Sequence, residues 1–119
     1  MPGRSPALYE SPFHELHRRR LAKEITTEEI ARAVLERIDR VESKVKAFIT
    51  LTPESVVANA KAADVRLAKG ETLSPIAGMP IAVKDVFSTS GVRTTCGSHI
   101  LENFTPPYDA TAVAKLKAQ

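Results

Sequence analysis

The segment from Thr26 to Val41 constrains the fold most, because it specifies an amphipathic helix together with its start. Thr26 and Glu29 have the spacing of a capping box, in which each side chain binds the backbone N–H of the other residue. Apolar residues then recur at helical spacing and form one stripe: Ile30, Ala33, Val34, Ile38 and Val41. A stripe of this width predicts a helix that packs on the protein's own sheet, with docking of another protein as the alternative.

Further elements are predicted on both sides of this helix. A first helix is expected from about Phe13 to Glu24, and the β-branched and aromatic content of Lys46–Leu51 predicts a strand. Thr52 then caps a helix that has Pro53 at its first position and Gly70 just past its end. The sequence therefore predicts helices and strands that alternate along the chain.

The strongest candidate for chemistry is the run Gly78-Met79-Pro80-Ile81-Ala82-Val83-Lys84-Asp85. Pro80 fixes its own φ after a glycine that permits a turn, so Ile81–Val83 predicts a buried strand start that places Lys84 in or beside a core. Burial lowers the pKa of an ammonium group by up to ~3–5 units, and the neutral amine that results is a general base. The alternative is that Lys84 extends to water with Asp85 as a solvated partner.

A long loop with turn chemistry and little periodicity is predicted from Phe87 to Tyr108. Within it, Thr94, Thr95 and Ser98 offer hydroxyl groups that could hydrogen-bond Lys84 or frame a pocket. Alternatively, these hydroxyls satisfy the backbone of the loop itself. Both interpretations make the loop the second candidate for a role at the lysine.

The end of the sequence predicts one more helix, from Asp109 as N-cap to Lys117. The element order is then helix, helix, strand, helix, strand, loop, helix, which is typical of α/β layering. The apolar stripe that Val113 and Leu116 begin continues for only about two turns. We therefore expect residues 1–119 to be an incomplete part of a larger protein, and the family resemblance given below implies that they are the N-terminal segment of a single domain.

Composition excludes several classes of protein. The 17 basic and 14 acidic residues are interspersed, so a net charge of +3 does not indicate a nucleic-acid-binding surface. The concentrated basic patch, Arg18-Arg19-Arg20 followed by Lys23, is interpreted as a solvated helix face, with contact to RNA as the alternative. The single cysteine, Cys96, fits a reducing compartment, and no apolar run approaches membrane-spanning length, so we expect a cytoplasmic protein without a membrane partner.

Two conventional site patterns are rejected. Ser98-His99 with Asp85 or Asp109 would imitate a serine–histidine–acid site, but adjacent residues of an extended segment point to opposite faces. His14 and His17 could share a helix face, yet two ligands without further cysteine or carboxylate partners are too few for a metal ion. No metal site is therefore predicted, and the absence of glycine-rich phosphate motifs predicts no nucleotide site.

Three segments resemble the amidase signature family. They are Gly78–Asp85, Gly91-Val92-Arg93-Thr94-Thr95-Cys96-Gly97-Ser98, and Leu101-Glu102-Asn103-Phe104-Thr105-Pro106-Pro107-Tyr108-Asp109-Ala110-Thr111. The resemblance covers nearly the whole chain and is densest from Pro75 to Leu116. It is nearest to the branch of the family that hydrolyses glutamine within glutamyl-tRNA(Gln) amidotransferases. The fold implied is an α/β/α sandwich around a mixed central sheet, with helices at the N-terminus.

The resemblance also implies roles for residues and partners. Lys84 resembles the general base of a Ser, cis-Ser, Lys triad, whose two serines belong to a Gly/Ser-rich segment beyond these residues, so the chain alone is expected to be inactive. The implied partners are subunits B and C of the complex, glutamine as substrate and Glu-tRNA(Gln) through the complex. No cofactor is implied for this chain, whereas ATP and Mg²⁺ are implied for one of the partner proteins. The residues that would recognise glutamine remain unassigned.

Two other functions stay open at this point. The chain could be a non-catalytic remnant or interaction module of an amidase-like protein, in which Lys84 has lost its role. It could also be a fragment of a general amidase that acts on small amides. The Thr-Thr-Cys-Gly-Ser and Pro-Pro-Tyr-Asp-Ala-Thr runs favour the tRNA-linked branch over this second alternative.

Overall fold

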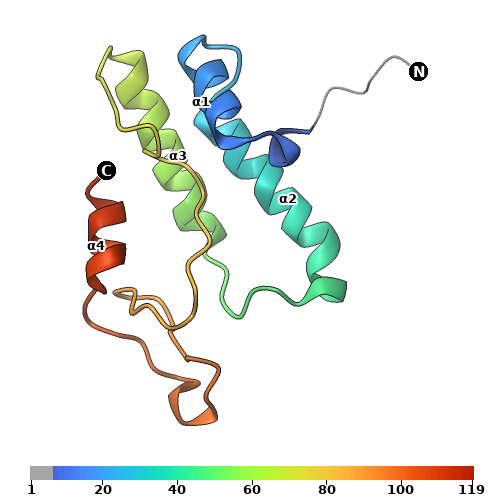
Figure 1. Cartoon of the computed structure of the whole chain (residues 1–119), viewed down its shortest axis with the longest axis vertical. Helices are drawn as coiled ribbons and strands as arrows, with labels where there is room; N and C mark the ends of the chain where they lie inside the picture. Colours follow the sequence, from blue (N-terminus) through green and yellow to red (C-terminus); the bar gives the residue numbers. More distant parts are fainter. Residues whose placement is uncertain (1–6) are drawn as a thin grey trace. The chain divides into compact units, whose positions relative to one another are not determined.

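The structure, a computed structural model, describes residues 7–119 and divides into two compact units. The first unit holds the described residues up to Ala47 together with Thr52–Pro80, and the second holds Phe48–Leu51 together with Ile81–Gln119. The helices, shown in Figure 1, are η1 (Leu8–Glu10), α1 (Phe13–Leu21), α2 (Thr27–Val45), α3 (Pro53–Ala68), η2 (His99–Leu101) and α4 (Thr111–Lys117). The motif Gly78–Asp85 crosses from the first unit to the second between Pro80 and Ile81.

The start of α2 confirms the predicted capping box. The Thr26 hydroxyl accepts a hydrogen bond from Glu29 N at 3.1 Å, and Glu29 Oε2 accepts one from Thr26 N at 2.7 Å. The predicted stripe begins at Ile30, which is 1% exposed and packs with Leu16 and Ile25 in the core of the first unit. The remaining residues of the stripe are half-buried: Ala33, Val34, Ile38 and Val41.

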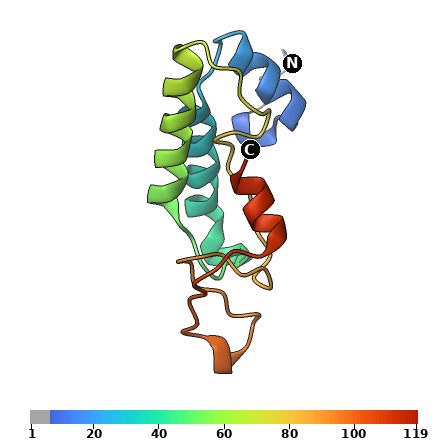
Figure 2. The ribbon, with the colours of Figure 1, turned by 90° about the vertical axis from the view of Figure 1, so that its left-hand side faces the viewer.

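Helices α2 and α3 lie side by side and antiparallel in both views of the ribbon (Figures 1 and 2). The buried face of α3 consists of alanines, Ala60 and Ala63, and such small side chains let a neighbouring backbone approach closely. Gly78 uses this space, because a Cβ atom there would lie 2.5 Å from the Cβ of Ala63. The helix begins at Pro53 as predicted, but the predicted side-chain cap from Thr52 is wrong, since its hydroxyl makes no capping hydrogen bond.

Asp64 of α3 ties the two helices together at the N-terminus of α2. Its carboxylate accepts hydrogen bonds from Thr27 N at 2.8 Å and from Glu28 N at 2.9 Å. These N–H groups have no partner within their own helix, and the positive end of the helix dipole favours a negative charge beside them. A residue from a different helix therefore completes the cap that Thr26 and Glu29 begin.

Replacing Asp64 with alanine is expected to lower the free energy of unfolding by about 2 kcal/mol, since two partly buried N–H groups lose a charged acceptor. Urea denaturation followed by helical circular dichroism measures this loss. Asp39→Ala, which changes an exposed acid on α2, serves as the matched control and should leave stability nearly unchanged. Equal effects of the two substitutions would contradict a capping role for Asp64.

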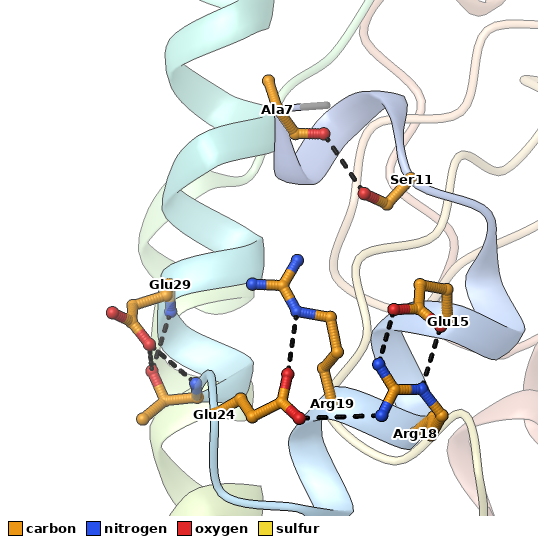
Figure 3. A network of polar contacts seen from close by, with 8 residues as sticks. Ala7, Ser11, Glu15, Arg18, Arg19, Glu24 and Glu29 are labelled. Atoms are coloured by element: carbon orange, nitrogen blue, oxygen red, sulfur yellow. Dashed lines mark hydrogen bonds and ion pairs between the residues drawn. The ribbon is translucent and has the colours of Figure 1, made fainter. Parts of the chain in front are cut away.

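The three arginines of α1 do not form one solvated face. Arg18 lies 2.7 Å from Glu15 and Arg19 lies 3.4 Å from Glu24, both as surface ion pairs (Figure 3). Arg20, in contrast, is 4% exposed, so the interpretation of this patch as solvated is wrong for Arg20. The segregation of these side chains to different sides of the helix leaves no continuous basic patch on α1.

Arg20 anchors the segment that precedes the Lys84 motif. Its Nη1 donates to the carbonyl oxygen of Ala77 at 2.7 Å, and its Nη2 donates to that of Pro75 at 3.1 Å. Burial lowers the pKa of Arg20, while the nearby carboxylate of Asp64 acts in the opposite direction. The guanidinium thus supplies hydrogen bonds to backbone carbonyls that no helix or strand satisfies.

The two predicted strands are where the structure departs most from the expectation. Lys46–Leu51 and Ile81–Val83 have no regular secondary structure, and the β pairing found within residues 7–119 is one isolated bridge between Thr89 and Val92. A strand requires pairing with a neighbouring strand, and no strand within residues 7–119 pairs with either segment. The mixed sheet is therefore not confirmed. No helix in the described part of the chain combines the length and apolarity needed to span a membrane.

Candidate functional site

Lys84 lies on the surface of the second unit in a segment of irregular structure. Its side chain is exposed, and Ile81 and Val83 are 48% and 44% exposed, so the predicted burial of this segment is wrong for the described residues. The physical reason is the missing neighbour strand, since nothing in the described chain covers the apolar run. The Lys84 carbonyl accepts a hydrogen bond from Phe87 N at 3.0 Å, which closes a turn directly after the lysine. The role of Lys84 as general base stays a prediction.

Asp85, the next residue, binds a turn ten residues further along the chain. Its Oδ1 accepts a hydrogen bond from Thr95 N at 2.8 Å, and its Oδ2 accepts one from the Thr95 hydroxyl at 2.5 Å. Oδ2 also accepts a bond from Gly97 N at 3.2 Å, and the Asp85 backbone carbonyl accepts one from Cys96 N at 2.9 Å. Three successive residues therefore donate to Asp85.

The turn can present these donors because of its backbone conformation. Cys96 and Gly97 both have positive φ, at 53° and 66°, and the N–H groups of Thr95, Cys96 and Gly97 all face Asp85. Glycine adopts this conformation without strain, whereas a cysteine there carries a steric cost. Thr95 is 5% exposed and anchors the turn in the interior of the second unit.

The hydrogen bonds to Asp85 set its charge. The Thr95 hydroxyl contributes most to lowering the pKa of Asp85, followed by the N–H groups of Thr95 and Gly97. The carboxylate is therefore negative at neutral pH and keeps its charge into the acid range. Among the described residues, Lys84 forms no ion pair with an acidic side chain. The alternative in which Asp85 is the partner of Lys84 is therefore not what the structure shows.

The other hydroxyls of the predicted pocket loop bind the loop itself. The Thr94 hydroxyl donates to the carbonyl of Val92 at 3.1 Å, and the Ser98 hydroxyl accepts a bond from Ile100 N at 3.2 Å as the cap of η2. Of the three residues predicted to frame a pocket, Thr95 alone reaches the lysine segment, through Asp85. A role of any of them in substrate binding stays a prediction.

Asp109 joins other segments of the same unit. The sequence predicts it as the N-cap of the last helix, but α4 begins at Thr111 with Ala110 in the capping position. The Asp109 carboxylate instead accepts a hydrogen bond from Ser90 N at 2.7 Å and pairs with Lys117 at 2.8 Å. Both contacts lower the pKa of Asp109, with the hydrogen bond from Lys117 as the larger cause.

The residues of the rejected site patterns make unrelated contacts. His99 lies 3.8 Å from Glu102 on the surface, and Asp85 and Asp109 bind the partners described above. His17 Nδ1 lies 3.2 Å from Arg20 Nη2, and its ring stacks on Phe13. The described residues contain no group of three or more histidine, cysteine, aspartate or glutamate side chains placed to hold a metal ion.

Sequence comparisons place these residues among known proteins. The model of the amidase family matches residues 29–119. The A subunit of the glutamyl-tRNA(Gln) amidotransferase from Geobacter sp. (strain M21) is 54% identical over 112 residues, which cover 94% of this chain and 23% of that protein. The corresponding protein of Geobacter metallireducens is 54% identical over 110 residues, covering 92% of this chain and 22% of that protein. The chain thus spans under a quarter of the length of these curated relatives.

A solved structure shows the same fold. It is described as an unexpected vestigial protein complex that reveals the evolutionary origins of an s-triazine catabolic enzyme, and its inhibitor-bound form matches equally well. The TM-score is 0.85 at 34% sequence identity, over 91% of this chain and 24% of the solved one. The resemblance predicted from the Lys84 motif and the two runs after it is confirmed, and the chain belongs to the amidase family.

Proposed function

We propose that this chain carries the general base of a glutamine-hydrolysing amidase, which supplies ammonia for the conversion of Glu-tRNA(Gln) to Gln-tRNA(Gln). The observation that carries the proposal is the 54% identity, over 94% of the chain, to the A subunit of a glutamyl-tRNA(Gln) amidotransferase. Lys84, Asp85 and Thr95 all lie within the region that the amidase family model matches. The relatives of this branch therefore share the segment in which the base and its neighbours lie.

The chemistry assigned to Lys84 is the acceptance of a proton. As a neutral amine it would take the proton of a nucleophilic serine through a bridging serine, and the serine would then attack the glutamine side-chain amide. Both serines would come from the part of an amidase that follows the matched region. The same part would cover the exposed apolar residues around the lysine, and burial would favour the neutral amine. These residues are Ile81, Val83, Val86 and Phe87.

The partners and location follow from the same proposal. The ammonia would pass to subunits B and C of the complex, where ATP and Mg²⁺ activate Glu-tRNA(Gln). Such a complex works in the cytoplasm, where tRNA is aminoacylated. A general amidase for other small amides is the second candidate, and the likeness to the complex connected with an s-triazine catabolic enzyme supports it. Its 34% identity is lower than the 54% identity to the amidotransferase, which favours glutamine.

The test is to let this chain replace the matching residues of the Geobacter sp. relative and to purify the product with the other proteins of that organism's amidotransferase. We call this complex the assembled enzyme. It is expected to release ammonia from glutamine at a rate within about tenfold of the parent complex, and this chain alone is expected to release none. Ammonia from other amides but not from glutamine would favour the general amidase. A folded complex inactive on every amide would favour an interaction module.

A further inference from the structure

Asp85 stands directly beside the proposed base and yet directs its carboxylate elsewhere. A carboxylate next to a lysine would ordinarily stabilise the charged ammonium, which is the form that cannot accept a proton. In the structure both carboxylate oxygens are occupied by Thr95 N, the Thr95 hydroxyl and Gly97 N. An ionised carboxylate has about four acceptor positions, so little of its capacity remains for Lys84.

Backbone hydrogen bonds add to these contacts on the C-terminal side of the lysine. The Lys84 carbonyl accepts a hydrogen bond from Phe87 N at 3.0 Å, and the Asp85 carbonyl accepts one from Cys96 N at 2.9 Å. Together with the carboxylate bonds, these contacts hold Lys84 through its main chain and Asp85 through both its main chain and its side chain. Lys84 is thus followed directly by a residue that is bound to the Thr95–Gly97 turn.

The turn is built to hold an anion. Cys96 and Gly97 have consecutive positive φ angles, and Thr95 adds a hydroxyl donor from a side chain that is 5% exposed. The pKa of Asp85 is lowered by these donors, so the carboxylate holds the turn as an anion well into the acid range. The interaction is therefore in place at neutral pH and above.

We propose that Asp85 is a positioning residue for Lys84. Its carboxylate and its carbonyl accept hydrogen bonds from the Thr95–Gly97 turn. These bonds fix the backbone next to the lysine, and they engage the carboxylate that would otherwise pair with the lysine amine. This inference rests on the proposed function, because it gives Asp85 a task only if Lys84 is a base. The alternative is that Asp85 merely stabilises the loop.

Kinetics of the assembled enzyme separate these roles. Asp85→Ala is expected to lower kcat for glutamine hydrolysis by about 100-fold, the effect of a base displaced by about an ångström, with little change in KM. Asp85→Asn keeps the shape of the side chain but loses the charge, and its kcat should lie between those of wild type and Asp85→Ala. Thr95→Ser keeps the hydroxyl and should have nearly the wild-type kcat, whereas Thr95→Val loses the hydroxyl and should have a lower kcat.

The pH profile of kcat/KM gives a readout that a structural role does not move. Thr95→Val removes the hydroxyl, one of the three donors to the Asp85 carboxylate. The acceptor position that it frees can pair with Lys84 and favour the charged ammonium, so activity should appear at higher pH than in wild type. Adding Asp85→Ala to Thr95→Val removes that carboxylate and should return the profile to its original position, at a lower rate. Exchange of the amide hydrogens of residues 95–97 should become faster in Asp85→Ala, which reports the loss of the turn independently of activity.

Each result decides between the roles. A fall in kcat without any shift of the profile in Thr95→Val assigns both residues to stability alone and overturns the proposal. Wild-type kcat in Asp85→Ala overturns it as well. Either result leaves the proposed function standing provided that Lys84→Ala is inactive, whereas an active Lys84→Ala removes the basis of both.

Discussion

Replacing Lys84 with alanine is expected to lower kcat for glutamine hydrolysis by about 10³-fold in the assembled enzyme, because alanine cannot accept the proton of a nucleophile. The complex should still form, since the side chain of Lys84 is exposed and does not belong to the core of its unit. Ammonia release from glutamine measures the rate, and co-purification of the component proteins measures assembly. Loss of activity together with loss of assembly would assign Lys84 to structure.

Two further variants sharpen this test. Lys84→Arg keeps the positive charge but presents a guanidinium that is not deprotonated in proteins, so it should be as inactive as the alanine variant. Lys115→Ala removes an exposed lysine from α4 of the same unit and should leave the rate unchanged. Hydrolysis retained in Lys84→Ala, or in Lys84→Arg, would show that the lysine is not the base.

Replacing Gly78 with alanine is expected to lower the free energy of unfolding by about 2–4 kcal/mol, from two separate costs. Gly78 has a φ of +74°, which side chains rarely adopt. An added Cβ atom would also lie 2.5 Å from the Cβ of Ala63 and 3.2 Å from the Asn59 carbonyl oxygen, so α3 would have to move. Urea denaturation followed by circular dichroism measures the loss.

Gly70 supplies the matched control, because its φ is +81° but an added Cβ atom would meet nothing within 4 Å. Gly70→Ala therefore carries the backbone cost alone, about 1–2 kcal/mol. The difference between the two variants isolates the close approach of the segment around Gly78 to α3. Equal losses would mean that this approach contributes nothing to stability.

The helices could be predicted from the sequence because their signals are local. The capping box of Thr26 and Glu29 joins residues three apart, and Pro53 marks the first turn of α3. The cap that Asp64 adds to α2 could not be predicted in this way, since it joins residues more than thirty positions apart. Local patterns therefore located the helices, while tertiary contacts decided what completes their ends.

The strands could not be predicted reliably, because an apolar run does not determine its own partner. Ile81–Val83 has the composition of a buried strand, but a strand forms only where another strand accepts its hydrogen bonds. In the described residues these side chains remain exposed, and Lys84 with them. The predicted burial of the lysine depended on that strand, so both predictions are wrong for the described residues.

Residues of the candidate site could be predicted from the sequence, but the hydrogen bonds between them could not. The sequence indicates both Lys84 and Thr95 as candidates, whereas it offers Asp85 only as a solvated partner in the alternative interpretation of the lysine. The hydrogen bond that Gly97 N adds to the Asp85 carboxylate depends on the positive φ of Cys96, a conformation that a cysteine does not predict. Gly97 is the local sign of a turn with positive φ, but it does not identify Asp85 as the acceptor.

The contacts of Arg20 also decide where this protein can be shortened. The family model begins its match at residue 29, which would suggest that the residues before α2 are dispensable. Arg20 nevertheless lies in α1 and donates to the carbonyls of Pro75 and Ala77, just before the turn at Gly78. A version trimmed to the family match would expose these carbonyls and remove the side chain that holds them. The first helix is thus part of the smallest unit worth expressing.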